Sequence, residues 1–253
     1  MNQATFYLID QLKAELDFCR PLPTPVVSKL EKVYTVQYTY NSNAIEGNTL
    51  TQRETEMVLE KGITVGGKTL VEHLEVIGHR DAVRYIEALA QSKAPNQFTE
   101  WEIRQIHNLI MRSVSPDEAG QYRNLDVRSA GTVYHYPTAF LVPALTKDLI
   151  DWLHLSTSSL HPVEYAAIAH LKLVTIHPFR DGNGRTARLV MNLILISQEY
   201  PIVSIPSEKW AEYIDVIVEA QQNHKKQLFV ELVLHSTVQS LQDTLEVVRS
   251  STG

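Results

Sequence analysis

The stretch from His177 to Arg188 constrains this 253-residue chain more than any other feature. It holds a histidine, an aspartate, a Gly-Asn-Gly turn and two arginines, and it lies between two apolar segments. The spacing of apolar residues predicts a buried helix over 162–175, and the nearly continuous apolar run at 189–196 predicts a core helix. The stretch is therefore predicted to form a tight loop that leads into a buried helix.

The residue types in this stretch suit the binding of a phosphate chain. Glycine and asparagine, at positions 182–184, tolerate a left-handed backbone, and the N–H groups that begin a helix attract anions. Arg185 and Arg188 share one face of the first helical turn, where positive charge is disfavoured unless an anion binds. Asp181 suits Mg²⁺, and His177 could accept a proton at neutral pH. We expect a site that binds nucleotide phosphates and activates a hydroxyl; the alternative is a capped helix with a solvated arginine pair.

The stretch resembles the signature of the Fic family, His-x-Phe-x-Asp/Glu-Gly-Asn-Gly-Arg-x-x-Arg, and it matches every defined position. Proteins with this signature mostly transfer AMP from ATP to a protein hydroxyl. The resemblance implies that His177 is the general base and that Asp181 is the Mg²⁺ ligand. It also implies an anion hole at Gly182 to Gly184, with Arg185 and Arg188 holding the β- and γ-phosphates. The expected ATP-binding residues are Asp181, Gly182, Asn183, Gly184, Arg185, Thr186, Ala187 and Arg188.

A second segment, residues 42–48, is similar to the Ser/Thr-x-x-x-Glu-Gly/Asn motif of the Fic inhibitory helix. Helical spacing predicts a helix over about 29–47, which places Glu46 at a helix C-terminus. A carboxylate is disfavoured there, and a partner cation would explain it. The resemblance implies an inhibitory pair of Glu46 with Arg188, preceded by Ser42. The alternative is an ordinary surface glutamate before a glycine.

Composition limits the other classes of function. The net charge is −6 and no basic stripe with interleaved aromatic residues is present, so nucleic-acid binding is not expected. The single cysteine, Cys19, allows no disulfide within the chain, and no spacing typical of a zinc site occurs. No apolar run is long enough for a membrane span, and the N-terminus lacks a signal pattern. We expect a cytoplasmic protein, although the family also has secreted bacterial effectors, and a homodimer is plausible for this class.

The predicted fold is all-α, a Fic-type helical bundle with one small β-hairpin. Residues 121–137 contain β-forming residues without helical period and follow Gly120-Gln121-Tyr122-Arg123, which matches the position of the Fic flap. In the family the flap pins the target chain and covers the nucleotide. The expected flap residues are Val127, Arg128, Ser129 and Ala130. A plain surface hairpin is the alternative.

Three regions are expected along the chain. Residues 1–97 form an N-terminal helical region with the inhibitory helix, 98–240 form the catalytic core, and 241–253 form a helix end and tail. By rough alignment with relatives, Tyr213 could stack on the adenine and Gln221 could bind the sugar or base. A packing role for the tyrosine is the alternative.

The resemblance implies an autoinhibited protein adenylyltransferase that uses ATP and Mg²⁺ to modify a Ser, Thr or Tyr hydroxyl, its own included. One rival is the reverse hydrolysis, in which Glu46 positions a water. Transfer of another group is a weaker alternative. A rival from another class is a nucleotide sensor without enzymatic activity, held off by Glu46.

Overall fold

The computed structural model describes residues 3–128, 134–156 and 159–252. The described residues form ten α-helices and three short 3₁₀ helices. The α-helices are α1 (Gln3–Phe18), α2 (Thr24–Ala44), α3 (Gln52–Lys61), α4 (Leu70–Ser92), α5 (Glu100–Met111), α6 (Val142–Ser156), α7 (Pro162–Ile176), α8 (Asn183–Ser197), α9 (Trp210–Asn223) and α10 (Lys226–Thr252). The 3₁₀ helices are η1 (Pro95–Gln97), η2 (Ala139–Leu141) and η3 (Ser207–Lys209).

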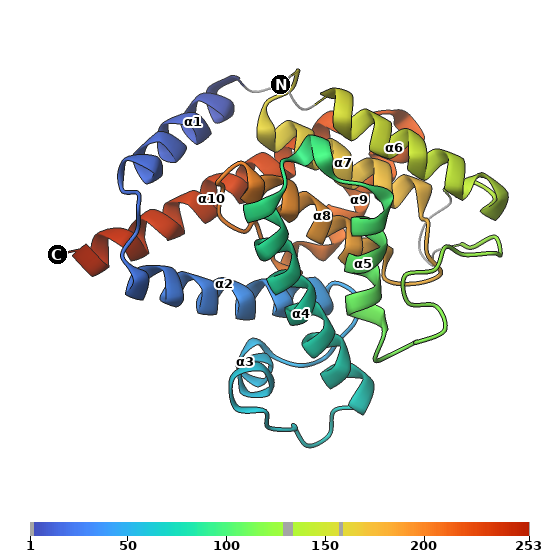
Figure 1. The fold of residues 1–253 in the computed structure, drawn as a ribbon, viewed down its shortest axis with the longest axis horizontal. Coiled ribbons are helices and arrows are strands. Elements are labelled where there is room, and N and C mark those ends of the chain that lie inside the picture. The colour runs from blue at the N-terminus through green and yellow to red at the C-terminus, as the bar shows by residue number, and fades with distance from the viewer. Residues whose placement is uncertain (1–2, 129–133, 157–158, 253) are drawn as a thin grey trace.

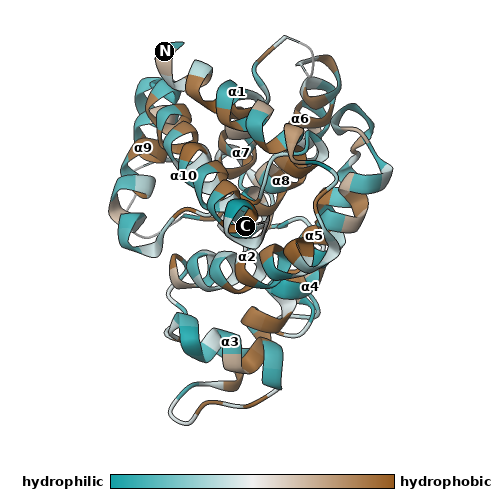
Figure 2. Ribbon diagram, turned by 90° about the vertical axis from the view of Figure 1, so that its left-hand side faces the viewer, coloured by the Kyte–Doolittle hydropathy of each residue, from teal (hydrophilic) through white to brown (hydrophobic). Residues whose placement is uncertain are grey.

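Helices α7 and α8 form the centre of the molecule, and the other long helices surround them (Figure 1). Both are buried over nearly their whole length, as the apolar runs predict. Figure 2 shows the apolar residues of α8 in the middle of the bundle. α10 packs against α1, α7 and α9, and α4 and α5 pack against α8 from another side. The loop between α7 and α8 therefore extends from the closely packed, buried centre of the fold.

Helix α2 lies along one side of the bundle, with α3 attached beyond it (Figure 1). It begins at Thr24, earlier than predicted, because Pro25 fits the first helical turn, where a missing N–H breaks no hydrogen bond. It ends at Ala44, and Glu46 lies in the turn that follows. α3 has a small core of its own, made of Leu50, Val58 and Val76. The turn at Glu46 thus joins the main bundle to a lightly packed extension.

The predicted β-hairpin at 121–137 is wrong for the part that the structure describes, since neither 121–128 nor 134–137 contains a strand. The backbone carbonyls of this segment accept from a side chain instead. Arg123 donates from Nη1 to Leu125 O at 3.1 Å and from Nη2 to Pro137 O. These bonds replace part of the ladder that a hairpin would need. The predicted flap residues Ser129 and Ala130 lie outside the described residues.

No helix in the described ranges is both long and apolar enough to cross a bilayer.

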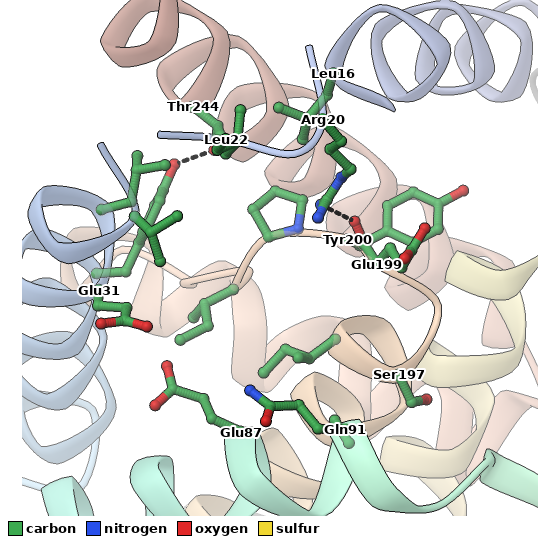
Figure 3. Close-up of a pocket in the computed structure, with 17 residues that line it drawn as sticks. Leu16, Arg20, Leu22, Glu31, Glu87, Gln91, Ser197, Glu199, Tyr200 and Thr244 are labelled. Atoms are coloured by element: carbon green, nitrogen blue, oxygen red, sulfur yellow. Dashed lines mark hydrogen bonds between the residues drawn. The ribbon is translucent and has the colours of Figure 1, made fainter. Parts of the chain in front are cut away.

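A cavity of about 510 Å³ lies between the α1–α2 connection, α2, α4 and the end of α8 (Figure 3). At one end the carboxylates of Glu31 and Glu87 point toward each other, and at the other Arg20 donates to Glu199 O at 2.9 Å. Burial and the nearby Glu31 raise the pKa of Glu87 to about 7. Among the residues that the structure describes, no predicted site residue lines this cavity.

The Glu87 carboxyl gives the first testable prediction. Between its ordinary pKa of 4.5 and about 7, the folded chain keeps a proton on Glu87 that the unfolded chain has released. The free energy of unfolding therefore falls as pH rises through this window. Glu87→Gln should raise the free energy of unfolding at pH 8 by about 1 to 2 kcal/mol and leave it unchanged at pH 4.5.

Urea unfolding at both pH values measures this difference. Glu56→Gln, a change at an exposed glutamate of α3, is the control and should have no effect at either pH. Equal effects of Glu87→Gln at pH 4.5 and pH 8 would contradict the assignment.

Candidate functional site

The loop between α7 and α8 takes its shape from two left-handed residues and one amide side chain. His177 ends α7 with φ 52°, and Gly182 precedes α8 with φ 72°. Asn183 Oδ1 accepts from Phe179 N and its Nδ2 donates to Phe179 O, both at 2.9 Å. A positive φ is uncommon at a residue other than glycine, so the conformation of His177 depends on its surroundings. Arg123 supplies one support, because its Nε donates to His177 O at 2.7 Å.

The imidazole of His177 is neutral and half-buried. Its Nδ1 lies 3.3 Å from Val174 O, which assigns the proton to Nδ1 and leaves the lone pair on Nε2. Burial lowers the pKa of His177 to about 4. At neutral pH the ring is therefore in the form that can accept a proton. The ring of Tyr136 stacks on it, with centroids 4.0 Å apart.

Arg188 is 1 % exposed and makes four hydrogen bonds. Three go to the end of α2 and the following turn: Nε to Ser42 Oγ at 3.0 Å, Nη2 to Ser42 O at 2.8 Å, and Nη2 to Glu46 Oε1 at 2.7 Å. The fourth runs from Nη1 to the Tyr213 hydroxyl at 3.1 Å. The predicted inhibitory residues, Ser42 and Glu46, thus bind Arg188, the arginine that is predicted to hold the γ-phosphate.

The carboxylate of Glu46 also lies against the first turn of α8. A Cβ atom at position 184 would overlap Glu46 Oε1, so a side chain there would have to displace the Glu46 carboxylate. The backbone of Gly184 is helical, and its glycine serves close approach rather than a left-handed turn. Among the three turn residues, only Gly182 has the left-handed backbone that the sequence suggested.

Arg185 has different partners from Arg188. It is 2 % exposed, and its Nη1 pairs with Glu75 Oε1 of α4 at 2.9 Å. Asn48 donates to the other oxygen of Glu75 at 3.0 Å, which ties the turn after Glu46 to this pair. Arg185 does not line the pocket that contains His177 and Arg188. Neither arginine is solvated, which excludes the plain alternative of an exposed arginine pair.

Asp181 offers the exposed carboxylate of the loop. Its Oδ1 accepts from Gly182 N at 2.6 Å, its Oδ2 lies 3.7 Å from Arg185 Nη2, and its side chain is 65 % exposed. In the described ranges, no three histidine, cysteine or acidic side chains gather closely enough to hold a metal ion. A divalent cation at Asp181 would take its remaining ligands from water or from a phosphate chain.

A pocket of about 410 Å³ is lined by part of this site, without Asp181 or Arg185. Its lining includes Glu46, Tyr136, His177, Gly184, Arg188, Tyr213 and Gln221. Both predicted adenosine residues are therefore present, but the Tyr213 ring is 1 % exposed. Its hydroxyl accepts from Arg188 and bonds to Nε2 of His170 at 2.8 Å. In this conformation Tyr213 supports the arginine and offers no free ring face.

The two predicted flap residues that the structure describes, Val127 and Arg128, lie outside the pocket. Val127 is half-buried and Arg128 is exposed. The segment instead reaches the site through Tyr136 and Arg123. Sequence reasoning missed both roles, as it missed Glu75. The Gly-Gln-Tyr-Arg run was visible, but no local pattern marks the contact of Tyr136 with His177.

Known proteins share this fold. The Fic/DOC family model matches residues 97–195. Fic-1 from Caenorhabditis elegans superposes with a TM-score of 0.89 at 33 % identity, covering 98 % of this chain and 73 % of that one. A Fic domain-containing signaling protein from Bacteroides thetaiotaomicron gives 0.87 at 29 % identity, with 96 % and 97 % covered. The chain belongs to the Fic/DOC family.

Curated relatives extend beyond this chain. The protein adenylyltransferase fic-1 of Caenorhabditis briggsae is 37 % identical over 217 residues, which are 85 % of this chain and 42 % of the relative. The chain thus spans less than half the length of that protein. The match to the family model begins at residue 97, beside the predicted core boundary at 98. The predicted end of the core at residue 240 stays a prediction.

The buried Arg185–Glu75 pair predicts a large effect on stability. Glu75→Ala removes the hydrogen-bonded counter-ion of the buried Arg185 guanidinium and leaves only the exposed Asp181 carboxylate, 3.7 Å away. The free energy of unfolding should fall by about 3 kcal/mol or more, because an unpaired buried charge is unfavourable. The control is Glu118→Ala, which removes an ion pair of 2.8 Å to Arg180, whose side chain is 66 % exposed. It should lower the free energy by less than about 1 kcal/mol. Equal losses in urea unfolding would contradict this prediction.

Proposed function

We propose that this chain transfers AMP from ATP to a hydroxyl group of a protein, itself included, and that Glu46 holds it in an inhibited state. The observation that carries the proposal is one pocket containing a neutral His177, the first turn of α8, and an Arg188 already bound to Glu46. The names of the relatives support the choice of AMP as the transferred group. The cytoplasmic location and the homodimer stay predictions.

His177 would act as the general base. Its Nε2 takes the proton of a Ser, Thr or Tyr hydroxyl while the hydroxyl oxygen attacks the α-phosphorus of ATP. The bond from that phosphorus to the oxygen shared with the β-phosphate breaks, and pyrophosphate leaves. The N–H groups at the start of α8, from Gly182 to Gly184, lie where growing negative charge would be stabilised.

Asp181 fits the role of a Mg²⁺ ligand. A largely exposed carboxylate beside a helix N-terminus supplies one hard oxygen, and Mg²⁺ accepts water and phosphate oxygens for the rest. Bound Mg²⁺ would add positive charge next to the phosphate oxygens. The same Asp181 carboxylate accepts from Gly182 N, which fixes its orientation toward the loop.

Glu46 would inhibit in two ways: it pairs with the charge of Arg188, and it fills space beside Gly184. Four hydrogen bonds already use the guanidinium of Arg188, so little remains for a γ-phosphate. The Glu46 carboxylate also lies against Gly184, where an anion should bind, and like charges repel. A nucleotide that enters this pocket would bind with its α-phosphate displaced from the line of attack, and a displacement of about 1 Å can lower a rate on the order of a hundredfold.

Glu46→Gly should therefore raise AMP transfer on the order of a hundredfold, measured as incorporation of label from α-labelled ATP with Mg²⁺. Glu46→Gln, which keeps the shape but loses the charge, should give an intermediate rate. Glu46→Gly/His177→Ala should return the rate to background, because the base is missing. Equal incorporation by the wild-type and Glu46→Gly chains would refute the proposed inhibition.

A hydrolytic alternative also has an observation in its favour. Glu46 places one carboxylate oxygen on Arg188, while the side chain stays 30 % exposed in the same pocket as His177. The other oxygen could orient a water. Self-modified Glu46→Gly protein, freed of ATP, would then release AMP when wild-type chain is added, and would keep its label when Glu46→Gly chain is added. ATP binding by calorimetry without transfer or release in any variant would favour a sensor.

A further inference from the structure

The ring of Tyr136 covers the imidazole of His177. The two rings lie nearly parallel, 30° apart, with centroids separated by 4.0 Å. Tyr136 belongs to the described end of the predicted flap segment and lines the same pocket as His177. Tyr134 packs edge-on against it at 5.3 Å. No sequence motif indicated this stack.

One buried guanidinium holds both members of the stack. The side chain of Arg123 is 1 % exposed, and it donates to the backbone carbonyls of His177 and of Pro137, the residue after Tyr136. It also donates to Leu125 O, at the other end of the segment. Because these acceptors are backbone atoms of three separate positions, Arg123 fixes the distance between the Tyr136 backbone and the left-handed His177.

We propose that Tyr136 is a positioning residue for His177: its ring, held by Arg123, keeps the imidazole in the orientation with Nδ1 on Val174 and shields one face from water. This inference rests on the proposed function, in which Nε2 of His177 accepts the target's proton. A base that is fixed before the target arrives loses less orientational freedom during the reaction.

The charges around His177 make its titration a readout of this shielding. Burial is the largest influence and lowers the pKa; Arg123 lowers it further, while Glu46 and Asp181 raise it. Arg188 lines the same pocket. Removing the Tyr136 ring changes none of these charges, so a rise in the pKa of His177 would report the return of water alone.

The experiment uses the full chain carrying Glu46→Gly, with Tyr136→Ala, Tyr136→Phe or His135→Ala added. kcat/KM for AMP transfer is measured from pH 5 to 8, and the imidazole of His177 is titrated by NMR, its signal assigned by its absence from His177→Ala. In the parent, His177 stays neutral down to its pKa of about 4, so its protonation leaves the rate level across this range. With Tyr136→Ala the pKa should rise toward the ordinary 6.5, the rate should fall tenfold per pH unit below the new value, and kcat at pH 8 should fall about tenfold.

Tyr136→Phe keeps the ring and should restore both the level profile and kcat within about twofold. His135→Ala removes an exposed neighbour in the same segment and should match the parent, which controls for the general effect of a substitution in this segment. A merely structural tyrosine would lower stability without moving the titration of His177.

An unchanged pKa of His177 in Tyr136→Ala would overturn the proposal, as would a Tyr136→Phe variant as impaired as the alanine variant. If Tyr136→Ala fails to fold, Tyr136→Leu replaces it with the same expectations. If Glu46→Gly transfers no AMP, the proposed function fails, while the NMR titration of the otherwise wild-type chain still decides whether Tyr136 controls His177.

Discussion

The buried guanidinium of Arg188 is the interaction on which the rest of the site depends. An arginine with 1 % exposure must satisfy its charge inside the fold, and here α2, its following turn and α9 supply the acceptors. Burial opposes its charge, but Tyr213 and Glu46 together keep the pKa of Arg188 above its ordinary value. Glu46, the proposed inhibitory residue, is therefore also the counter-ion of Arg188 in this structure. Any ligand that displaces Glu46 has to provide a carboxylate-like partner of its own, and a phosphate chain does so.

The site also shows that the two arginines of one motif have different neighbours. Arg188 faces the pocket and the α2 turn, whereas Arg185 faces α4 and pairs with Glu75. The predicted contact of Arg185 with a β-phosphate stays a prediction. Glu75, which already pairs with Arg185, would have to share the guanidinium with that phosphate. Asn48 connects the two pairs, because it follows Glu46 in the chain and bonds to Glu75. The turn after α2 is thus fastened at both arginines.

Local sequence determined most of the helices and the loop of the motif. Apolar periodicity located α7 and α8, and the helix predicted to end near residue 47 located the turn of Glu46. Segments shaped by distant residues were missed. The chain at 121–137 follows Arg123 rather than a hairpin ladder, and the Glu75–Arg185 pair joins positions 110 residues apart. The burial of Tyr213 depends on His170 of another helix, which no spacing within α9 could indicate.

Gly184 adds a steric component to the proposed inhibition. Glu46 Oε1 occupies the space that a side-chain carbon atom would need at this residue, so in the proposed mechanism the carboxylate and a phosphate oxygen would compete for that space. Weakening the charge of Glu46 alone would leave that volume filled. In the proposed mechanism each molecule would hold either the Glu46 carboxylate or a nucleotide oxygen beside Gly184, so intermediate activity in a sample would reflect the proportion of molecules in each state.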